Sequence, residues 1–195
     1  MSGRRVLRPG DDDVNSYALL TALVVPRPIA WVATVDADGV GNLAPHSFFT
    51  VASVRPPVLA FTSIGVKDTL RNIRATGEFT VSLVDEESVD AANATSATFG
   101  PEVDEAERAG VVMAPGVVVN PGYVAEAPAA LECRLHDTVE FAGSTVVFGE
   151  VVAFSIDEDV LDGGHPVFER LRPVARLGRD EWALPPEVIR RARPD

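Results

Sequence analysis

The chain has 195 residues, of which 46% are hydrophobic and 24% charged, a composition typical of a soluble globular domain with a sizeable core. Its net charge is −12, and this acidity argues against a nucleic-acid partner because the nucleic-acid phosphates would be repelled. The single cysteine, Cys133, excludes an internal disulfide and a multi-cysteine metal cluster. No apolar run reaches the roughly 18 residues of a membrane span, and no signal-peptide core is evident, so we expect a cytoplasmic protein without a membrane partner.

In chain order, we expect an N-terminal arm with a short helix over residues 1–24, one domain over residues 25–184 and a C-terminal tail over residues 185–195. Residues 28–51 predict two strands joined by a turn at DADG, whose Asp and Gly suit a hairpin loop. VLAFTS predicts a further strand, and TLRNIRAT predicts a short amphipathic helix that ends at Gly77.

The second half of the domain is richer in long β segments. EFTVSLVD alternates apolar and hydroxyl-bearing residues, which predicts a half-buried strand. Residues 85–110 predict two short helices, and residues 111–128 a strand with an extended loop. ALECRLHDTVEFAG and STVVFGEVVAFSID predict a hairpin that turns at Ala142-Gly143, followed by a loop-rich region with short helical pieces. Many strands with only small helices between them favour a mainly β fold with short helices, a barrel or a sandwich.

The stretch SIGVKDTLR, from Ser63 to Arg71, places a lysine, an aspartate and a threonine where a strand gives way to a helix. A helix start exposes backbone N–H groups and the positive end of the dipole, so it suits an anion, to which Lys67 adds a charge and Thr69 a hydroxyl. The nine residues alone favour a plainer interpretation, a helix capped by Asp68 beside a solvated lysine, since Asp is a common N-cap.

Several segments together resemble a known family. PRPIAWVATVDADGVGNLAPHSFF, KDTLRNI, GEFTVSLV, LEC, GEVV and RPVARLG stand in the order and spacing of the flavin reductase-like, FMN-binding split-barrel family, which includes flavoredoxin-type proteins and the reductase components of two-component monooxygenases. The resemblance runs from about residue 24 to residue 182. It implies a split β-barrel, an FMN cofactor and a homodimer with FMN at the interface. It also implies that the anion expected at the start of the helix is the FMN 5′-phosphate, with Lys67, Thr69 and Ser63 as ligands and Asp68 orienting them.

The segment NLAPHSFF resembles the flavin-cradling loop of the family. An isoalloxazine ring needs polar donors at its edge and an apolar face beneath it. Asn42 can give an amide to the ring edge or the ribityl chain, Ala44 and Pro45 permit close backbone approach, and Ser47 supplies a hydroxyl. The alternative is a loop that merely connects two strands, with its phenylalanines in the core.

His46, beside the expected flavin, is the candidate catalytic residue, as a nicotinamide contact or a proton shuttle, although many loop histidines do neither. Arg27 lies beside the flavin in related proteins, or else at a dimer contact, and Arg176 is a candidate for the ligand side of the pocket. The three histidines are too scattered for a metal site. Ser155 stands where many relatives have a histidine, and if that histidine meets NAD(P)H, the use of free NAD(P)H is in doubt.

The resemblance implies an FMN-dependent oxidoreductase, an NAD(P)H:flavin reductase that uses NADH or NADPH and passes electrons to oxygen, a second flavin or a partner monooxygenase. An alternative is an FMN-binding electron carrier without its own NAD(P)H site, which Ser155 slightly favours. A third interpretation is a split barrel that binds haem or a deazaflavin. The sequence has no haem-ligand motif, and this interpretation does not account for KDT.

Overall fold

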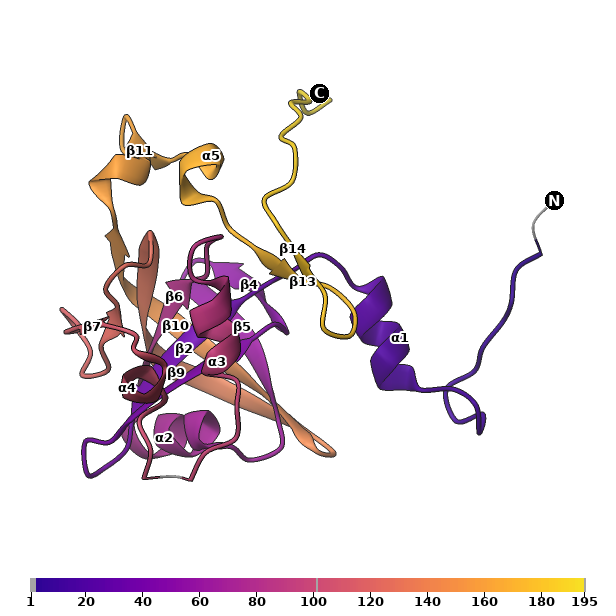
Figure 1. Ribbon diagram of the computed structural model, residues 1–195, viewed down its shortest axis with the longest axis horizontal. Coiled ribbons are helices and arrows are strands. Elements are labelled where there is room, and N and C mark those ends of the chain that lie inside the picture. The colour runs from indigo at the N-terminus through magenta and orange to yellow at the C-terminus, as the bar shows by residue number, and fades with distance from the viewer. Residues whose placement is uncertain (1–2, 101, 195) are drawn as a thin grey trace.

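The computed structural model describes residues 3–100 and 102–194 and shows a strand-rich body with short helices around it (Figure 1). Seven strands form one sheet in the order β3-β2-β6-β9-β10-β5-β4, and each neighbouring pair is antiparallel. The expected mainly β class is confirmed. These strands are β2 (Ala30–Val35), β3 (Gly41–His46), β4 (Phe49–Val54), β5 (Pro57–Ile64), β6 (Glu78–Leu83), β9 (Ala129–Phe141) and β10 (Ser144–Ile156).

The helices and the remaining strands of the described residues are short. The helices are α1 (Ser16–Leu23), α2 (Asp68–Thr76), α3 (Val89–Ala94), α4 (Glu105–Ala109), α5 (Phe168–Leu171) and the 3-10 turn η1 (Glu158–Val160). A small sheet joins β1 (Arg27–Pro28), β13 (Ala175–Arg176) and β14 (Trp182–Ala183). Two further pairs are β7 (Met113–Ala114) with β8 (Tyr123–Val124) and β11 (Leu161–Asp162) with β12 (His165–Pro166). None of the helices in these described ranges has the length and apolar character to cross a membrane.

The predicted turns form where the backbone needs glycine. Gly143 has a φ of 82° in the turn between β9 and β10, and Gly77 has a φ of 73° at the end of α2. Positive φ is cheap only for glycine, so these two positions end their elements as the sequence predicts. In the β2–β3 hairpin the Asp36 carboxylate accepts hydrogen bonds from the N–H groups of Asp38 and Val40, at 2.9 and 2.8 Å. The helix and both hairpins are therefore confirmed.

The prediction of two strands over residues 28–51 is wrong, because a third strand, β4, begins at Phe49 within this stretch. The chain turns at Ser47 and Phe48, leaves β3 at one edge of the sheet and enters β4 at the other edge. No glycine marks this turn in LAPHSFFTV, so nothing in the sequence separates the end of β3 from the start of β4.

The prediction of a half-buried β6 is also wrong, because its hydroxyl-bearing face is buried as well. Thr80 and Ser82 are 0% exposed. The segment 111–128 covers them: Thr80 Oγ1 donates to the Gly122 carbonyl oxygen, and Ser82 Oγ accepts from the Val124 N–H at 3.0 Å. Hydroxyl groups can be buried in this way because each has a backbone partner.

The core has two parts, one on each face of the sheet. On one face α2 packs Leu70 and Ile73 against Phe61 and Phe79, with Cys133 in the same cluster. Cys133 is buried in this cluster, and burial raises the pKa of its thiol to about 12. Packing of α2 on this face fixes where its N-terminus points.

On the other face Trp31 and Leu43 pack with Ala92 of α3 and Ala106 of α4. This second cluster holds α3 and α4 against β3.

Candidate functional site

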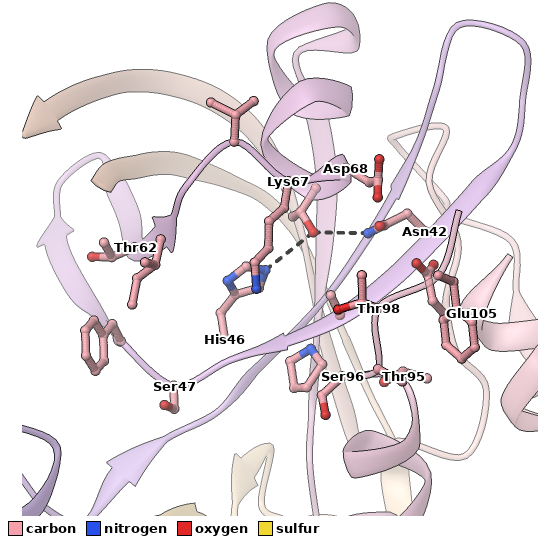
Figure 2. Close-up of a pocket in the computed structure, with 18 of the residues that line it drawn as sticks. Asn42, His46, Ser47, Thr62, Lys67, Asp68, Thr95, Ser96, Thr98 and Glu105 are labelled. Carbon is pink, nitrogen blue, oxygen red and sulfur yellow. Dashed lines mark hydrogen bonds between the residues drawn. The ribbon is translucent and has the colours of Figure 1, made fainter. Parts of the chain in front are cut away.

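A cavity of about 410 Å³ opens beside the start of α2. Its walls come from β3 and the turn after it, the end of β5, the first turn of α2, the loop after α3 and one residue of α1 (Figure 2). Eight of the eleven residues predicted from the sequence line this cavity: Asn42, Ala44, Pro45, His46, Ser47, Lys67, Asp68 and Thr69. The structure thus brings the NLAPHSFF and KDT segments, far apart in sequence, to one site.

Ser63 is one of three predicted residues that lie outside the lining of this cavity. Successive side chains of a strand point to opposite faces, so Thr62 and Ile64 line the cavity while Ser63 faces away from it. Ser63 is 0% exposed, and its hydroxyl donates to the Gly65 carbonyl at 3.0 Å. The neighbouring hydroxyl, Thr62, therefore takes the place at the cavity that the sequence assigns to Ser63.

Arg27 and Arg176 also lie outside the cavity lining, and both make contacts with backbone. The buried guanidinium of Arg27 donates to the carbonyls of Val24 and Leu177, at 2.9 and 2.7 Å, and to Ser47 Oγ at 3.4 Å. Arg176 donates to the Arg179 carbonyl at 2.9 Å and lies over the Trp182 ring, 4.9 Å from its centroid. In the described protomer Arg27 holds α1 and the pocket turn together, and Arg176 holds the β13–β14 hairpin.

The start of α2 differs from the capped helix that the residues alone favour. Lys67 occupies the N-cap position, and no side chain caps the helix. Asp68 is the first helical residue and pairs with Arg71 one turn later, so the expectation that Asp68 caps the helix is wrong. An uncapped first turn leaves backbone N–H groups without helical partners, and these groups with the helix dipole favour an anion.

Lys67 adds a full positive charge to this corner. It is exposed, it is the sole lysine of the chain, and among the described residues it has no ion-pair partner. Figure 2 shows its side chain extending from the helix start across the cavity toward His46. A free ammonium group at an uncapped helix start forms the most cationic part of the cavity wall.

A chain of buried side chains lies beneath this corner (Figure 2). Asn42 Nδ2 donates to Thr69 Oγ1 at 3.1 Å, and Thr69 Oγ1 lies 3.4 Å from His46 Nε2. Because the Thr69 hydroxyl is already used in this chain, its backbone N–H is the group it can offer to an anion. The two segments of the site are locked together by these contacts.

His46 is held in its neutral form. Burial and the charge of Lys67 lower the pKa of His46 to about 4, although a hydrogen bond with the Thr62 backbone opposes this shift. The ring packs on Phe61 with centroids 4.7 Å apart. A neutral, buried imidazole between Thr69 and the Thr62 backbone favours a positioning role for His46 over proton transfer near neutral pH.

The loop between α3 and α4 is the part of the site that the sequence analysis missed. Five consecutive residues, 95–99, line the cavity, and Thr95 fixes the loop by accepting from Trp31 Nε1 at 2.9 Å and donating to the Ala92 carbonyl at 3.0 Å. The signal was the run TSAT, small hydroxyl-bearing residues between two short helices. The prediction of two short helices over residues 85–110 did not include this run as part of the site.

Glu105, the second residue that was missed, is a buried carboxylate at the rim. It is 7% exposed, its Oε2 accepts from the Leu43 N–H at 3.1 Å, and burial raises its pKa. An isolated Glu in an acidic stretch gives no sequence signal for this position, because only the packing of α4 on β3 brings it to the cavity.

Comparisons with known proteins identify the family and the fold of this chain. Residues 22–171 match the family described as flavin reductase like domain. An uncharacterized protein of Aquifex aeolicus is 38% identical over 179 residues, covering 89% of this chain and 91% of its own. A split barrel domain from Shewanella frigidimarina superposes with a TM-score of 0.86 over 98% of this chain and 100% of its own, at 20% identity, and so confirms the split-barrel fold.

Three solved structures are more similar in sequence. Nitrilotriacetate monooxygenase component B from Bacillus cereus is 30% identical, with a TM-score of 0.90 over 96% of this chain and 100% of its own. The 2-nitrobenzoate 2-nitroreductase of Pseudomonas fluorescens is 29% identical, with a TM-score of 0.91 over 98% and 96%. Flavoredoxin of Desulfovibrio vulgaris (Miyazaki F) is 27% identical, with a TM-score of 0.79 over 86% and 91%.

Proposed function

We propose that this chain, which belongs to the flavin reductase-like domain family, is an FMN-dependent flavin reductase that takes electrons from NADH or NADPH. The observation that carries the proposal is the uncapped start of α2, with the free Lys67 beside it, at the wall of a cavity of about 410 Å³. A cavity of this size is in the range of sites for small molecules and cofactors. The cationic helix start fits the phosphate end of FMN.

Different residues of the cavity would bind different parts of FMN. Lys67 and the first N–H groups of α2 would bind the phosphate. Asn42, which contacts Thr69, would meet the ribityl chain, and the small residues Ala44 and Pro45 would leave room for the planar ring. Ser47 and Thr62 supply hydroxyl groups at the other side of the cavity, as Figure 2 shows.

Bound FMN would supply the redox chemistry, because it accepts a hydride equivalent from a nicotinamide and passes the electrons on. The protein would contribute position and charge. His46 stays neutral and orients Thr69 and Asn42, and the Lys67 charge favours any anionic form of the ligand. Hydride transfer needs no acid–base pair, which agrees with a site whose histidine is neutral near pH 7 and so does not act as an imidazolium acid.

For the electron acceptor we favour a partner monooxygenase. The support is the similarity to a protein that is itself a monooxygenase component. The similar nitroreductase makes a small aromatic acceptor the competing choice. The two choices are distinguished by measuring oxygen consumption with a purified oxygenase and, separately, direct reduction of a nitroaromatic compound. The first activity supports the partner monooxygenase and the second supports the small aromatic acceptor.

The homodimer is part of the same proposal. α1 is apolar but projects from the body (Figure 1), and Leu23 on it is 75% exposed. β4 is an edge strand, and Val54 on it is 79% exposed. Exposed apolar side chains on a projecting helix and an edge strand favour an interface with a second copy. Light scattering after gel filtration tests this, and a mass of one chain would contradict it.

The experiment that tests the function is an anaerobic titration of the FMN-loaded protein with NADH and then with NADPH, followed by the absorbance of the flavin. Bleaching by either nucleotide supports the reductase and names its donor. Binding of FMN without bleaching supports the alternative of an electron carrier. Failure of FMN to bind refutes both.

The electron carrier has one specific support, the similarity to flavoredoxin. The serine at position 155 does not add to it within one protomer. Ser155 is not among the residues that line the cavity, and it lies nine residues along β10 from Val146, the partner of Thr62 in the ladder, a span of at most about 30 Å at about 3.3 Å per residue. A histidine missing from this position is therefore no loss from the lining of the cavity in the same protomer.

A further inference from the structure

Two arginines lie opposite each other in the small sheet that β1, β13 and β14 form beside the cavity. Arg27 of β1 and Arg176 of β13 are direct cross-strand partners, so their side chains lie on the same face of this sheet. Like charges placed directly opposite each other destabilise a strand pair. Burial and the charge of Arg176 both lower the pKa of Arg27. The fold therefore keeps a repulsive pair of cations at this position.

No carboxylate in the part of the chain that the structure describes neutralises this pair. Neither arginine takes part in an ion pair there, and Asp180 and Glu181 of the adjoining turn are exposed and pair with neither. Arg27 gives its N–H groups to three carbonyls and a hydroxyl. Arg176 bonds only to two carbonyls of its own hairpin, and a guanidinium has five N–H donors. Arg176 thus keeps donors for an anion.

The pair lies at one end of the cavity that would hold FMN. Arg27 Nε donates to Ser47 Oγ at 3.4 Å, and its guanidinium lies 5.8 Å from the ring centroid of Phe48. Ser47 and Phe48 both line the cavity. Figure 2 shows Ser47 and Glu105 on opposite sides of it. From the Ser47 side the row of Arg27 and Arg176 leads away from the cavity across the small sheet.

The Glu105 side of the cavity is acidic. Glu105 is 7% exposed, and it adjoins Asp36 and Asp68 in the wall of a smaller cavity on that side. The cation in that wall, Arg71, is paired with Asp68. The chain as a whole carries a net charge of −12. An anionic substrate is therefore repelled from the Glu105 side and attracted to the side with the unpaired arginines.

The chemistry of the electron donor identifies the anion. In NADH and NADPH the nicotinamide is joined through one ribose to a pyrophosphate. When the nicotinamide meets a flavin in the cavity, the pyrophosphate lies one sugar away and so falls outside the rim. The cationic corner at Lys67 is already assigned to the phosphate of FMN. The pyrophosphate of the donor therefore needs a second cationic group beside the cavity, and a guanidinium suits it because its N–H groups match phosphate oxygens.

We propose that Arg176 binds the pyrophosphate of NADH or NADPH, with the charge of Arg27 beside it, and so makes the site selective for a nicotinamide dinucleotide. This inference rests on the proposed function, because it requires a flavin in the cavity and a nicotinamide donor. It gives a reason for keeping two arginines in repulsive register, since the bound anion relieves the repulsion.

The test compares two electron donors with the same reactive ring. One is the nucleotide that bleaches the bound flavin, and the other is N-benzyl-dihydronicotinamide, which has no phosphate. KM and kcat for both are measured for the wild-type protein, Arg176→Gln, Arg176→Lys and Arg170→Gln. Arg170 is the matched control, because it also bonds to two backbone carbonyls and has no ion-pair partner among the described residues, but lies outside the cavity lining. Thermal melts confirm that each variant is folded.

We expect Arg176→Gln to raise the KM of the nucleotide by about tenfold, the effect of one charge-assisted hydrogen bond, and to leave kcat unchanged. The KM of the benzyl compound should stay the same. Arg176→Lys keeps the charge and should recover part of the loss, whereas Arg170→Gln should have no effect. Equilibrium dialysis gives a readout without turnover: oxidised NAD should bind the FMN-loaded Arg176→Gln protein about tenfold more weakly than the wild type.

Equal rises in KM for the nucleotide and the benzyl compound would show that Arg176 acts through the shape of its hairpin, and they would overturn the proposal. A lower mass of Arg176→Gln than of the wild type on gel filtration would assign Arg176 to a contact with a second copy and would also overturn it. Both results leave the reductase standing. Failure of NADH and of NADPH to bleach the wild-type protein loaded with FMN refutes the proposed function itself, and this inference with it.

Discussion

Replacement of Lys67 by methionine removes the ammonium group but keeps most of the apolar stem. It should weaken the binding of FMN and leave the binding of riboflavin unchanged. One hydrogen bond to a charged group contributes about 1.5–3 kcal/mol. Lys67 is exposed, so solvent screens its charge and we take the lower end, about 1.5 kcal/mol, or about tenfold in the dissociation constant of FMN. Riboflavin has no phosphate, and its affinity should stay the same.

The assay is a fluorescence titration of both flavins at low and high salt. The difference between the wild-type protein and the variant should shrink at high salt, because the Debye length falls from roughly 14 Å at about 0.05 M to about 3 Å at about 1 M. Equal losses of FMN and riboflavin affinity would show that Lys67 acts on the shape of the site, and they would refute the phosphate assignment.

Chemical labelling gives an independent check, because Lys67 is the only lysine in the chain. An amine-reactive reagent should modify Lys67 slowly in the presence of FMN and quickly in the presence of riboflavin, as read from the mass of the peptide that contains it. Labelling at the same rate with both flavins would contradict direct contact with the phosphate.

Three further predictions concern single residues. Burial of Glu132 by itself would raise its pKa, but hydrogen bonds from the backbone N–H groups of residues 117–119, at 2.6 to 2.9 Å, lower it. Glu132→Gln should therefore lower the free energy of unfolding, measured in urea melts, by about 2–4 kcal/mol. The stability contributed by this charge is present above the usual carboxyl pKa and is lost as pH falls through the lower folded value, so the variant should show a weaker acid dependence. The His46 ring should titrate in NMR spectra with a midpoint near 4, and a midpoint near 6.5 would show that it is not buried. Gly149→Ala would drive a methyl group into Phe79 and should lower stability by about 1–3 kcal/mol in thermal melts, whereas an unchanged melting temperature would mean that the ring can move aside.

Features that depend on neighbours along the chain could be predicted from the sequence. Gly77 ends α2 and Gly143 turns the long hairpin because each conformation is a property of one residue and its immediate neighbours. The mainly β class followed from the number of β segments with only short helices between them. The segments NLAPHSFF and KDT were recognised as parts of one site by their resemblance to a family, not by any contact visible in the sequence.

Tertiary structure decided which side chains meet at the cavity. The sequence assigns a phosphate contact to Ser63, but the register of β5 turns Thr62 to the cavity instead. It assigns the Thr69 hydroxyl to the ligand, but that group is already bound to Asn42. It places Arg27 beside the flavin or at a dimer contact, and in the fold the guanidinium donates to three backbone carbonyls of its own protomer.

The physical reason for this division is distance along the chain. A turn or a cap is set by atoms a few residues apart, whereas the loop 95–99 and Glu105 reach the cavity because α3 and α4 pack on the sheet face that contains Trp31 and Leu43. The sequence by itself determined the local elements and their order. The packing of two apolar faces on one sheet decided which polar groups were left to line the site.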